Sequence, residues 1–211
     1  MLKRLTESLA QKPLIYNICR RIIEFNYMAI KRTIRKEFSL DQNKKYSNVK
    51  NDSPQRILDI ACGQGEFCTL FDLFSYTGID ICLRYIGYAK RTYDRNFFCC
   101  DARQSSFKNA YFIKVLVIGL LHHLDDLSVE VVLKETGRVL EKDGKVLLIE
   151  DAPTSLKWNI IGKLLQRYDI GENIRIYTAY KEVLEKNFII SKYYHLKSGF
   201  WDYSVFVLLP K

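Results

Sequence analysis

Residues 57–67 read ILDIACGQGEF, a short apolar segment that runs directly into a turn rich in small residues. The apolar segment predicts a strand over 56–60, and glycines in such a turn let the backbone come close to a ligand. We expect a helix to follow, from about Glu66 to Phe74. The order of strand, small-residue turn and helix is typical of a sheet that binds a ligand beyond its strand ends.

Strand and helix then alternate along most of the remaining sequence. Six more strands are predicted, at 76–79, 97–100, 113–118, 145–150, 188–194 and 203–209. Helices are predicted at 83–93, 128–140, 156–167 and 179–186, with Ser128 as the cap of the second and a turn at 142–144 after it. The pattern predicts an α/β fold with a Rossmann-like, doubly wound sheet of seven strands. Its last two strands, joined by a turn at 198–199, should form an antiparallel hairpin.

The N-terminal quarter of the chain differs from the rest in charge. Residues 1–50 hold 12 Lys and Arg against 4 Asp and Glu, whereas residues 51–211 hold 21 against 20. Apolar residues at helical spacing predict a helix, or a broken pair of helices, over 13–36, and a polar linker or surface loop over 39–55. We expect a basic helical extension or lid at 1–50 and a Rossmann-like domain at 51–211. The extension could face phosphate, an acidic substrate or, through residues 14–36, a membrane surface. The alternative is a basic helical face that is simply solvated.

Bulk composition excludes several classes of protein. Hydrophobic residues make up 48% of the chain and charged residues 27%, which favours a packed core over disorder. No apolar run reaches the roughly 20 residues of a membrane-spanning helix, and residues 1–12 lack the features of a secretory signal. The six cysteines include no Cys-x-x-Cys pair, so reduced thiols are expected rather than a zinc cluster. The expectation is a cytoplasmic protein, at most peripheral to a membrane.

Acidic residues lie in or directly after three of the predicted strands, at the edge where doubly wound sheets bind ligands. Asp59 precedes the turn at 61–65. Asp80 follows Asp59 by 21 residues, and a carboxylate there can accept hydrogen bonds from both hydroxyls of a ribose. Asp101 could accept from an adenine amino group, while the amide of Ala102 donates to the ring. The structural alternatives are a helix cap for Asp80 and a loop contact for Asp101.

Residues 119–126, after the fourth strand, read GLLHHLDD. The adjacent His122 and His123 lie where a cofactor and an acceptor would meet, and an unperturbed histidine titrates near neutrality. Either could act as a general base, or both could bond the backbone and shape the pocket. A His/Asp metal site would need further ligands that the sequence does not place, so no metal site is predicted.

Five stretches resemble, in order and spacing, the successive motifs of class I S-adenosylmethionine-dependent methyltransferases: 57–67, YTGID (76–80), FFCCDA (97–102), 119–126 and RVLEKDGKVLLIED (138–151). They are similar in particular to the small-molecule branch that has His-His-Leu after the fourth strand. The family fold is a seven-stranded sheet with a reversed final hairpin, in agreement with the prediction above. Two positions depart from the family: Ala61 stands where a first glycine is usual, and Ile113 where an Asp often begins the fourth strand.

The resemblance implies that the chain binds S-adenosylmethionine and releases S-adenosylhomocysteine. Asp59 and the turn would surround the methionine part of the cofactor, Asp80 the ribose, and Asp101 with Ala102 the adenine. The expected cofactor-binding residues are Asp59, Ala61, Cys62, Gly63, Gln64, Gly65, Asp80, Ile81, Asp101, Ala102, Gly119 and Leu120. The candidate catalytic residues are His122 and His123, and the candidates for lining the acceptor site are Tyr16, Tyr168, Arg175 and Tyr177.

The sequence favours a small-molecule or lipid-like acceptor over nucleic acid. The basic N-terminus is compatible with RNA, but the remainder is nearly neutral and lacks the Asn/Asp-Pro-Pro-aromatic motif of many base-amino methyltransferases. A nicotinamide-dependent oxidoreductase would need a third glycine where Cys68 stands. A methyltransferase-like subunit that binds the cofactor without catalysis stays an alternative. The identity of the acceptor, the atom methylated and the oligomeric state are not predicted.

Overall fold

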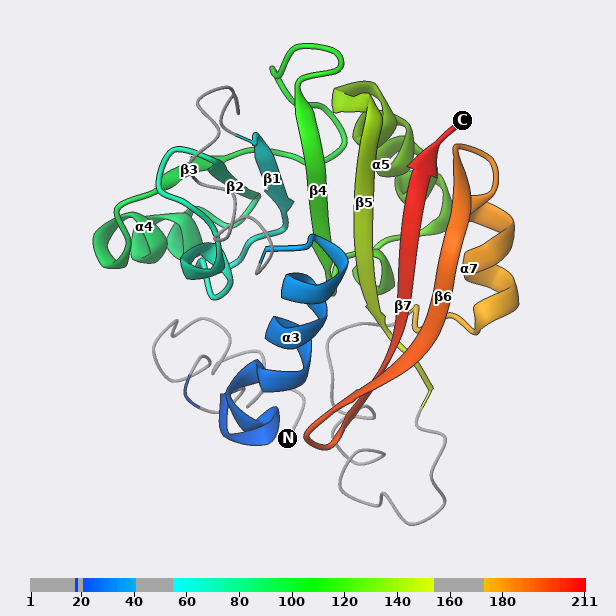
Figure 1. The fold of residues 1–211 in the computed structure, drawn as a ribbon, viewed down its shortest axis with the longest axis horizontal. Helices are drawn as coiled ribbons and strands as arrows, with labels where there is room; N and C mark the ends of the chain where they lie inside the picture. Colours follow the sequence, from blue (N-terminus) through cyan, green and yellow to red (C-terminus); the bar gives the residue numbers. More distant parts are fainter. Residues whose placement is uncertain (1–17, 19–20, 41–54, 154–172) are drawn as a thin grey trace.

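The computed structural model describes residues 18, 21–40, 55–153 and 173–211. Its centre is a seven-stranded sheet with the strand order β3-β2-β1-β4-β5-β7-β6, and β7 runs antiparallel to both of its neighbours (Figure 1). The strands are β1 (Ile57–Ile60), β2 (Tyr76–Asp80), β3 (Asn96–Cys99), β4 (Phe112–Ile118), β5 (Leu140–Asp151), β6 (Phe188–Ser198) and β7 (Trp201–Pro210). The predicted seven-stranded fold and its terminal hairpin are confirmed.

Helices cover both faces of the sheet (Figure 1). The helices are α3 (Met28–Glu37), α4 (Leu83–Thr92), α5 (Asp126–Val139) and α7 (Tyr177–Leu184). Ile34 of α3 and Ile86 of α4 belong to one apolar core, and Val132 of α5 and Tyr180 of α7 belong to the other. Because both faces of β4 are covered, its apolar run is buried, as is usual for a central parallel strand. The basic helix α3 is therefore built onto the sheet.

The chain just before α3 is broken by left-handed backbone. Residues 21–23 are helical, and a 3₁₀-turn, η1 (Phe25–Tyr27), separates them from α3. All three residues of η1 have positive φ, between 49° and 57°. This part of the predicted segment 13–36 is thus the broken form of the helix, and the break turns Tyr27 into the core.

The predicted helix from Glu66 to Phe74 is wrong. Residues 61–75 form successive turns that include only a short 3₁₀-helix, η3 (Cys68–Leu70). Phe71 is extended, with φ −117° and ψ 156°, so it ends η3 and interrupts the predicted helix. Phe71 is buried and Phe74 is largely exposed, so these residues do not form one apolar helical face.

Two boundaries in the middle of the chain also differ from prediction. Asp125, and not Ser128, caps α5, because its side chain accepts the Ser128 backbone N–H at 2.7 Å. The predicted turn at 142–144 lies inside β5, which begins at Leu140 and shifts its register against β4. The predicted helix 156–167 lies outside the described residues.

Candidate functional site

Two cavities open beyond the carboxyl ends of the parallel strands, at the edge that the sequence predicts. Their volumes are about 230 and 240 Å³, and Ala61 and Asp80 line both. The first is lined by Tyr27, Ile30, Ala61, Cys62, Gly63, Gln64, Glu66, Phe67, Asp80, Tyr85, Ile118, Gly119, His122, His123, Asp151 and Tyr203. The second is lined by Ala61, Ile79, Asp80, Ile81, Cys100, Asp101, Ala102, Arg103, Leu120, Leu124 and Val132. The two cavities therefore meet at Ala61, directly after β1, and at Asp80, the last residue of β2.

The turn after β1 is shaped by left-handed backbone. Ala61, Gly63 and Gly65 have φ of 61°, 54° and 81°. A Cβ at Gly65 would lie 2.8 Å from the ring of Phe97, so only glycine fits there. A Cβ at Gly63 would meet no atom within 4 Å, which leaves open space over the backbone on the cavity side of the turn. The turn thus exposes backbone to the first cavity.

Ala61 carries strain that its family counterpart, a glycine, would not. A non-glycine residue in the left-handed region costs roughly 1–2 kcal/mol, and a glycine there avoids this cost. Part of the benefit is lost, because glycine also makes the unfolded chain more flexible. We expect Ala61→Gly to raise the free energy of unfolding by about 0.5–1 kcal/mol in chemical denaturation. Ala179→Gly, in the first turn of α7, is the control and should lower it by about 0.5–1 kcal/mol. A loss at Ala61 as large as at Ala179 would contradict the strain.

Asp80 is held at the junction of the two cavities by its neighbours' backbone. Its Oδ2 accepts the N–H of Gly63 at 2.9 Å, and its Oδ1 accepts the N–H of Cys82 at 2.8 Å. Burial raises the pKa of the Asp80 carboxyl, and these two bonds oppose that rise. A carboxylate has about four acceptor positions, so each oxygen can accept one further hydrogen bond from a ligand.

Gln64 brings a buried acceptor to the first cavity. Its side chain lines the cavity and is 6% exposed, and no described residue bonds to its amide oxygen Oε1. A buried acceptor without a partner costs free energy, so its position suits a ligand that donates a hydrogen bond. The neighbouring Cys62 packs into the wall of the same cavity.

Asp59 lies behind the turn. Its carboxyl is 1% exposed and accepts the hydroxyl of Tyr76 at 2.7 Å. Burial raises the pKa of Asp59 to about 7, the Tyr76 bond lowers it, and the charge of Asp80 raises it further. Asp59 and Gly65 are absent from the walls of both cavities. Within the described structure they shape the turn from behind.

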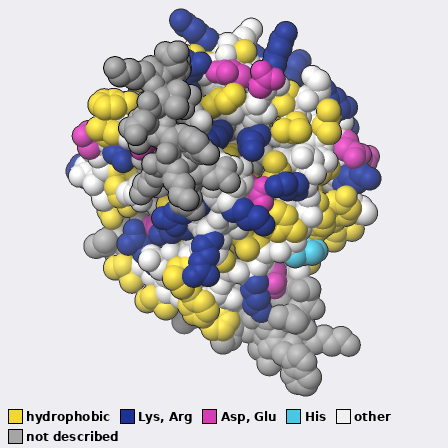
Figure 2. Space-filling model, viewed as in Figure 1, with side chains coloured by type: hydrophobic (Ala, Val, Ile, Leu, Met, Phe, Trp, Pro, Cys, Tyr) yellow, Lys and Arg dark blue, Asp and Glu magenta, His cyan; other side chains and the backbone are white. Residues whose placement is uncertain are grey.

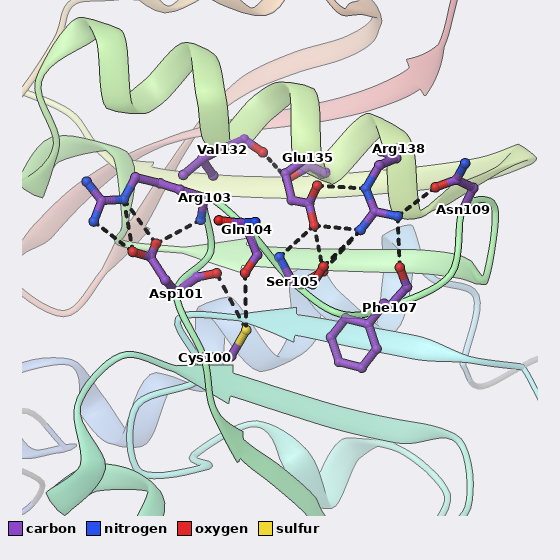
Figure 3. Close-up of polar contacts among 11 residues, drawn as sticks. Cys100, Asp101, Arg103, Gln104, Ser105, Phe107, Asn109, Val132, Glu135 and Arg138 are labelled. Carbon is purple, nitrogen blue, oxygen red and sulfur yellow. Dashed lines mark hydrogen bonds and ion pairs between the residues drawn. The ribbon is translucent and has the colours of Figure 1, made fainter.

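The second cavity is mostly apolar and is closed by the loop after β3. Ala102 and Ile81 line it, while both oxygens of Asp101 accept from the Arg103 guanidinium, which lowers the pKa of that carboxyl (Figure 3). The same loop is tied to α5, because Glu135 accepts from Ser105 and pairs with Arg138 (Figure 3). The loop is thus fixed over the cavity by polar contacts to a helix.

Glu150, at the end of β5, is a site residue that the sequence reasoning missed. It is fully buried, and it accepts the backbone N–H groups of Leu120 at 2.9 Å and Leu121 at 2.8 Å through Oε1. Its Oε2 accepts the backbone N–H of His122 at 3.3 Å and lies 2.9 Å from the ring Nδ1 of the same residue. One carboxylate therefore fixes the 3₁₀-helix η4 (Leu121–His123) and the ring of His122.

The hydrogen bonds of Glu150 assign the tautomer of His122. An oxygen that already accepts a backbone N–H acts as an acceptor, so the ring proton belongs on Nδ1. Nε2 is then the unprotonated nitrogen, and it lies 3.9 Å from Oδ2 of Asp151. The Asp151 carboxylate is held in turn by the indole N–H of Trp201 at 2.8 Å. The buried His122 is therefore an oriented base on the cavity wall, whereas His123 stacks 4.0 Å from it and is exposed.

Two acceptor-side candidates from the sequence have other roles. Arg175 binds the carbonyl oxygens of Leu121 and Leu124, and so clamps η4 from outside. The Tyr177 ring packs 4.1 Å from the Tyr193 ring. Neither lines the first or second cavity, and Tyr16 and Tyr168 lie outside the described residues.

The described lining of the first cavity includes the acids Glu66, Asp80 and Asp151 but no Lys or Arg. Glu66 pairs with Arg21 and Lys31 at 2.8 and 2.7 Å, so its charge is already balanced from outside the lining. Within residues 18, 21–40, 55–153 and 173–211, no group of three or more His, Cys, Asp or Glu is placed to hold a metal ion. Such a cavity favours a ligand with positive charge over one with phosphate groups.

Residues 57–144 match a family described as "Methyltransferase domain". Over 170 residues, the chain is 27% identical to the demethylmenaquinone methyltransferase of Thermotoga maritima. The alignment covers 78% of this chain and 67% of that protein. The matched family segment includes every strand end that lines the second cavity, together with Asp80 and His122.

Two solved structures share the fold. A methyltransferase of Archaeoglobus fulgidus, described as S-adenosylmethionine-dependent, superposes with a TM-score of 0.60 at 18% identity, over 86% of this chain and 99% of that one. The geranyl diphosphate C-methyltransferase of Streptomyces coelicolor A3(2), solved with Mg²⁺, geranyl diphosphate and S-adenosyl-L-homocysteine, gives a TM-score of 0.59 at 12% identity, over 82% and 80%. At these identities the likeness establishes the fold.

Proposed function

We propose that this chain, a class I S-adenosylmethionine-dependent methyltransferase, methylates a small, uncharged, lipid-like acceptor that carries a hydroxyl group. The observation that carries this proposal is the buried His122–Glu150 pair, whose histidine lines a cavity with no Lys or Arg in its described wall. The Thermotoga relative is named for demethylmenaquinone, which supports a lipid-like acceptor.

The residues of the two cavities fit the cofactor. Asp80 lies where they meet, so a ribose bound there would have one part of the cofactor on each side. The apolar second cavity suits adenine, beside Ile81, Ala102 and Leu120. In the first cavity, the backbone at Gly63 and the buried oxygen of Gln64 suit the methionine part, whose ammonium group can donate to that oxygen. The acids there also favour the positive charge of the sulfonium.

S-adenosylmethionine supplies a methyl group on a positively charged sulfur, and direct displacement leaves neutral S-adenosylhomocysteine. The residues of this chain have to align the acceptor, exclude water and take a proton. The Nε2 atom of His122 takes the hydroxyl proton of the acceptor, while the Nδ1 proton stays bonded to Glu150. The resulting imidazolium is stabilised by the Glu150 carboxylate and by Asp151, 3.9 Å away. The acceptor oxygen would then form the bond to the methyl carbon as the carbon–sulfur bond breaks. If a ring carbon conjugated with that oxygen forms the bond instead, the hydrogen on that carbon has to leave afterwards as a proton.

Methyl transfer from labelled S-adenosylmethionine to a panel of acceptors tests this function. We expect labelled product with isoprenoid-tailed hydroquinones and none with transfer RNA. His122→Gln should lower kcat by about 10²–10³-fold with little change in cofactor affinity, because it removes the base and keeps the shape. His123→Gln is the matched control and should retain most of the activity.

Two outcomes would overturn the proposal. Labelling of RNA without labelling of any hydroquinone would make the chain an RNA methyltransferase. Micromolar binding of S-adenosylmethionine in calorimetry, without transfer to any member of the panel, would favour a cofactor-binding subunit that does not catalyse.

A further inference from the structure

The break before α3 leaves large apolar side chains on the surface. Ile22, Phe25 and Met28 are 69%, 56% and 51% exposed, and the Phe25 ring contacts Phe200 at the tip of the β6–β7 hairpin. These positions precede or begin α3, whose own apolar residues Ile30 and Ile34 are buried. A cluster of exposed apolar side chains of this size marks a surface that binds something.

The charged residues of the same segment separate by sign. Within residues 21–37, the two acids are buried and bonded: Glu24 accepts the hydroxyl of Tyr203, and Glu37 accepts from Lys192. Arg21 and Lys31 pair with Glu66 at 2.8 and 2.7 Å. The other cations of this segment, Arg32, Arg35 and Lys36, are exposed. The surface that the segment presents to solvent is therefore cationic and apolar at once.

Figure 2 shows this arrangement on the face that carries α3. Lys and Arg side chains cross the middle of the face, and hydrophobic side chains gather along its lower edge. In Figure 1 the same lower edge holds the chain before α3 and the tip of the β6–β7 hairpin. Cations therefore lie on one side of the apolar cluster.

We propose that residues 21–36 dock this face on an anionic lipid bilayer. Apolar side chains alone would suit many partners, and cations alone would suit a nucleic acid. Their combination on one helical segment suits a bilayer interface, where apolar groups enter the acyl boundary and cations contact lipid phosphates. No described helix is long and apolar enough to cross a membrane, so the contact is at the surface.

The docking surface and the first cavity share one segment. Tyr27 and Ile30, on the inward side of that segment, line the cavity, while Phe25 and Met28 point outward. A bilayer bound to the outward side would lie next to the cavity wall, so a lipid-like acceptor would have a short path from the bilayer. This consequence rests on the proposed function, whereas the docking itself does not.

Co-sedimentation of the full chain with vesicles tests the docking. We expect binding to vesicles that contain phosphatidylglycerol, binding at least tenfold weaker to pure phosphatidylcholine, and a decrease as salt rises. Ile22→Ser with Phe25→Ser, and separately Arg32→Gln with Arg35→Gln, should each weaken binding at least tenfold. Leu127→Ser with Val131→Ser, also exposed at 78% and 46% but on α5, should leave binding unchanged.

The outcomes separate the docking from the proposed function. Lack of binding to anionic vesicles by folded, active protein would overturn the docking alone. Loss of binding only in the arginine variants, together with tight binding of transfer RNA, would make the surface a nucleic-acid site. Vesicle binding that follows both variant pairs would support the docking even if no lipid-like acceptor is methylated.

Discussion

Asp80→Ala should weaken binding of S-adenosylmethionine at least a hundredfold. The substitution removes two acceptor positions that face the proposed ribose site, and hydrogen bonds to charged groups are worth about 1.5–3 kcal/mol each. A loss of about 3 kcal/mol corresponds to roughly a hundredfold in Kd. It also removes the acceptor of the Gly63 and Cys82 N–H groups, so the turn over the first cavity loses its anchor. Calorimetric titration of the purified variant measures the change.

A second variant and a control separate cofactor binding from folding. Asp80→Asn keeps the side-chain volume and one acceptor oxygen, and it should weaken binding less than Ala does. Asp125→Ala removes a carboxylate that also bonds backbone, as the cap of α5, and should cost about 1 kcal/mol of stability with unchanged cofactor affinity. Asp80→Ala that is folded by circular dichroism and binds the cofactor as tightly as the wild type would contradict the ribose assignment.

The strand ends were the part of the site that the sequence could predict. Parallel strands present their carboxyl ends at one edge, so Gly63, Asp80 and His122 had to lie near one another once the alternation of strand and helix was recognised. All three residues line the first cavity at that edge. The prediction succeeded because it needed only element order and no side-chain detail.

Glu150 shows where that reasoning stopped. The sequence places an acidic pair at the end of the fifth strand, the same signal that identified Asp80. Its partners lie 28–30 residues earlier and meet it only because β4 and β5 pair in the sheet. The position of Glu150 at a strand end could be predicted from the order of the elements. Its bond to the ring of His122 could not, because that bond depends on tertiary geometry.

The predicted helix at 66–74 failed for a local reason. A strand and a small-residue turn favour a helix as the next element, but the backbone can bury Phe67 and Phe71 through turns as well. Left-handed Ala61, Gly63 and Gly65 precede them, and periodicity carries no information about such conformations. Asp101 lines the second cavity as well, but its pairing with Arg103 through both oxygens is a local contact that element order does not predict.

Glu150→Gln should lower kcat by about 10²–10³-fold while the Kd for S-adenosylmethionine stays within a few-fold of wild type. A glutamine of the same shape can keep its oxygen on the Leu120 and Leu121 N–H groups, which places its NH₂ against the His122 ring. Nδ1 would then have to accept, and the ring proton would move to Nε2, where it blocks the base. The variant should therefore regain activity as pH rises, since the hydroxyl of the acceptor then ionises without the enzyme.

A purely structural role for Glu150 predicts a different result. It would lower stability and raise KM together with the Kd of the cofactor, and it would leave the shape of the pH profile unchanged. Glu37→Gln is the matched control: this carboxylate is also buried and accepts from Lys192 and Tyr194, and it does not line either cavity. If Glu150→Gln and Glu37→Gln reduce kcat equally, Glu150 does not orient a catalytic base. A selective loss that high pH restores would identify Glu150 as the positioning residue of His122.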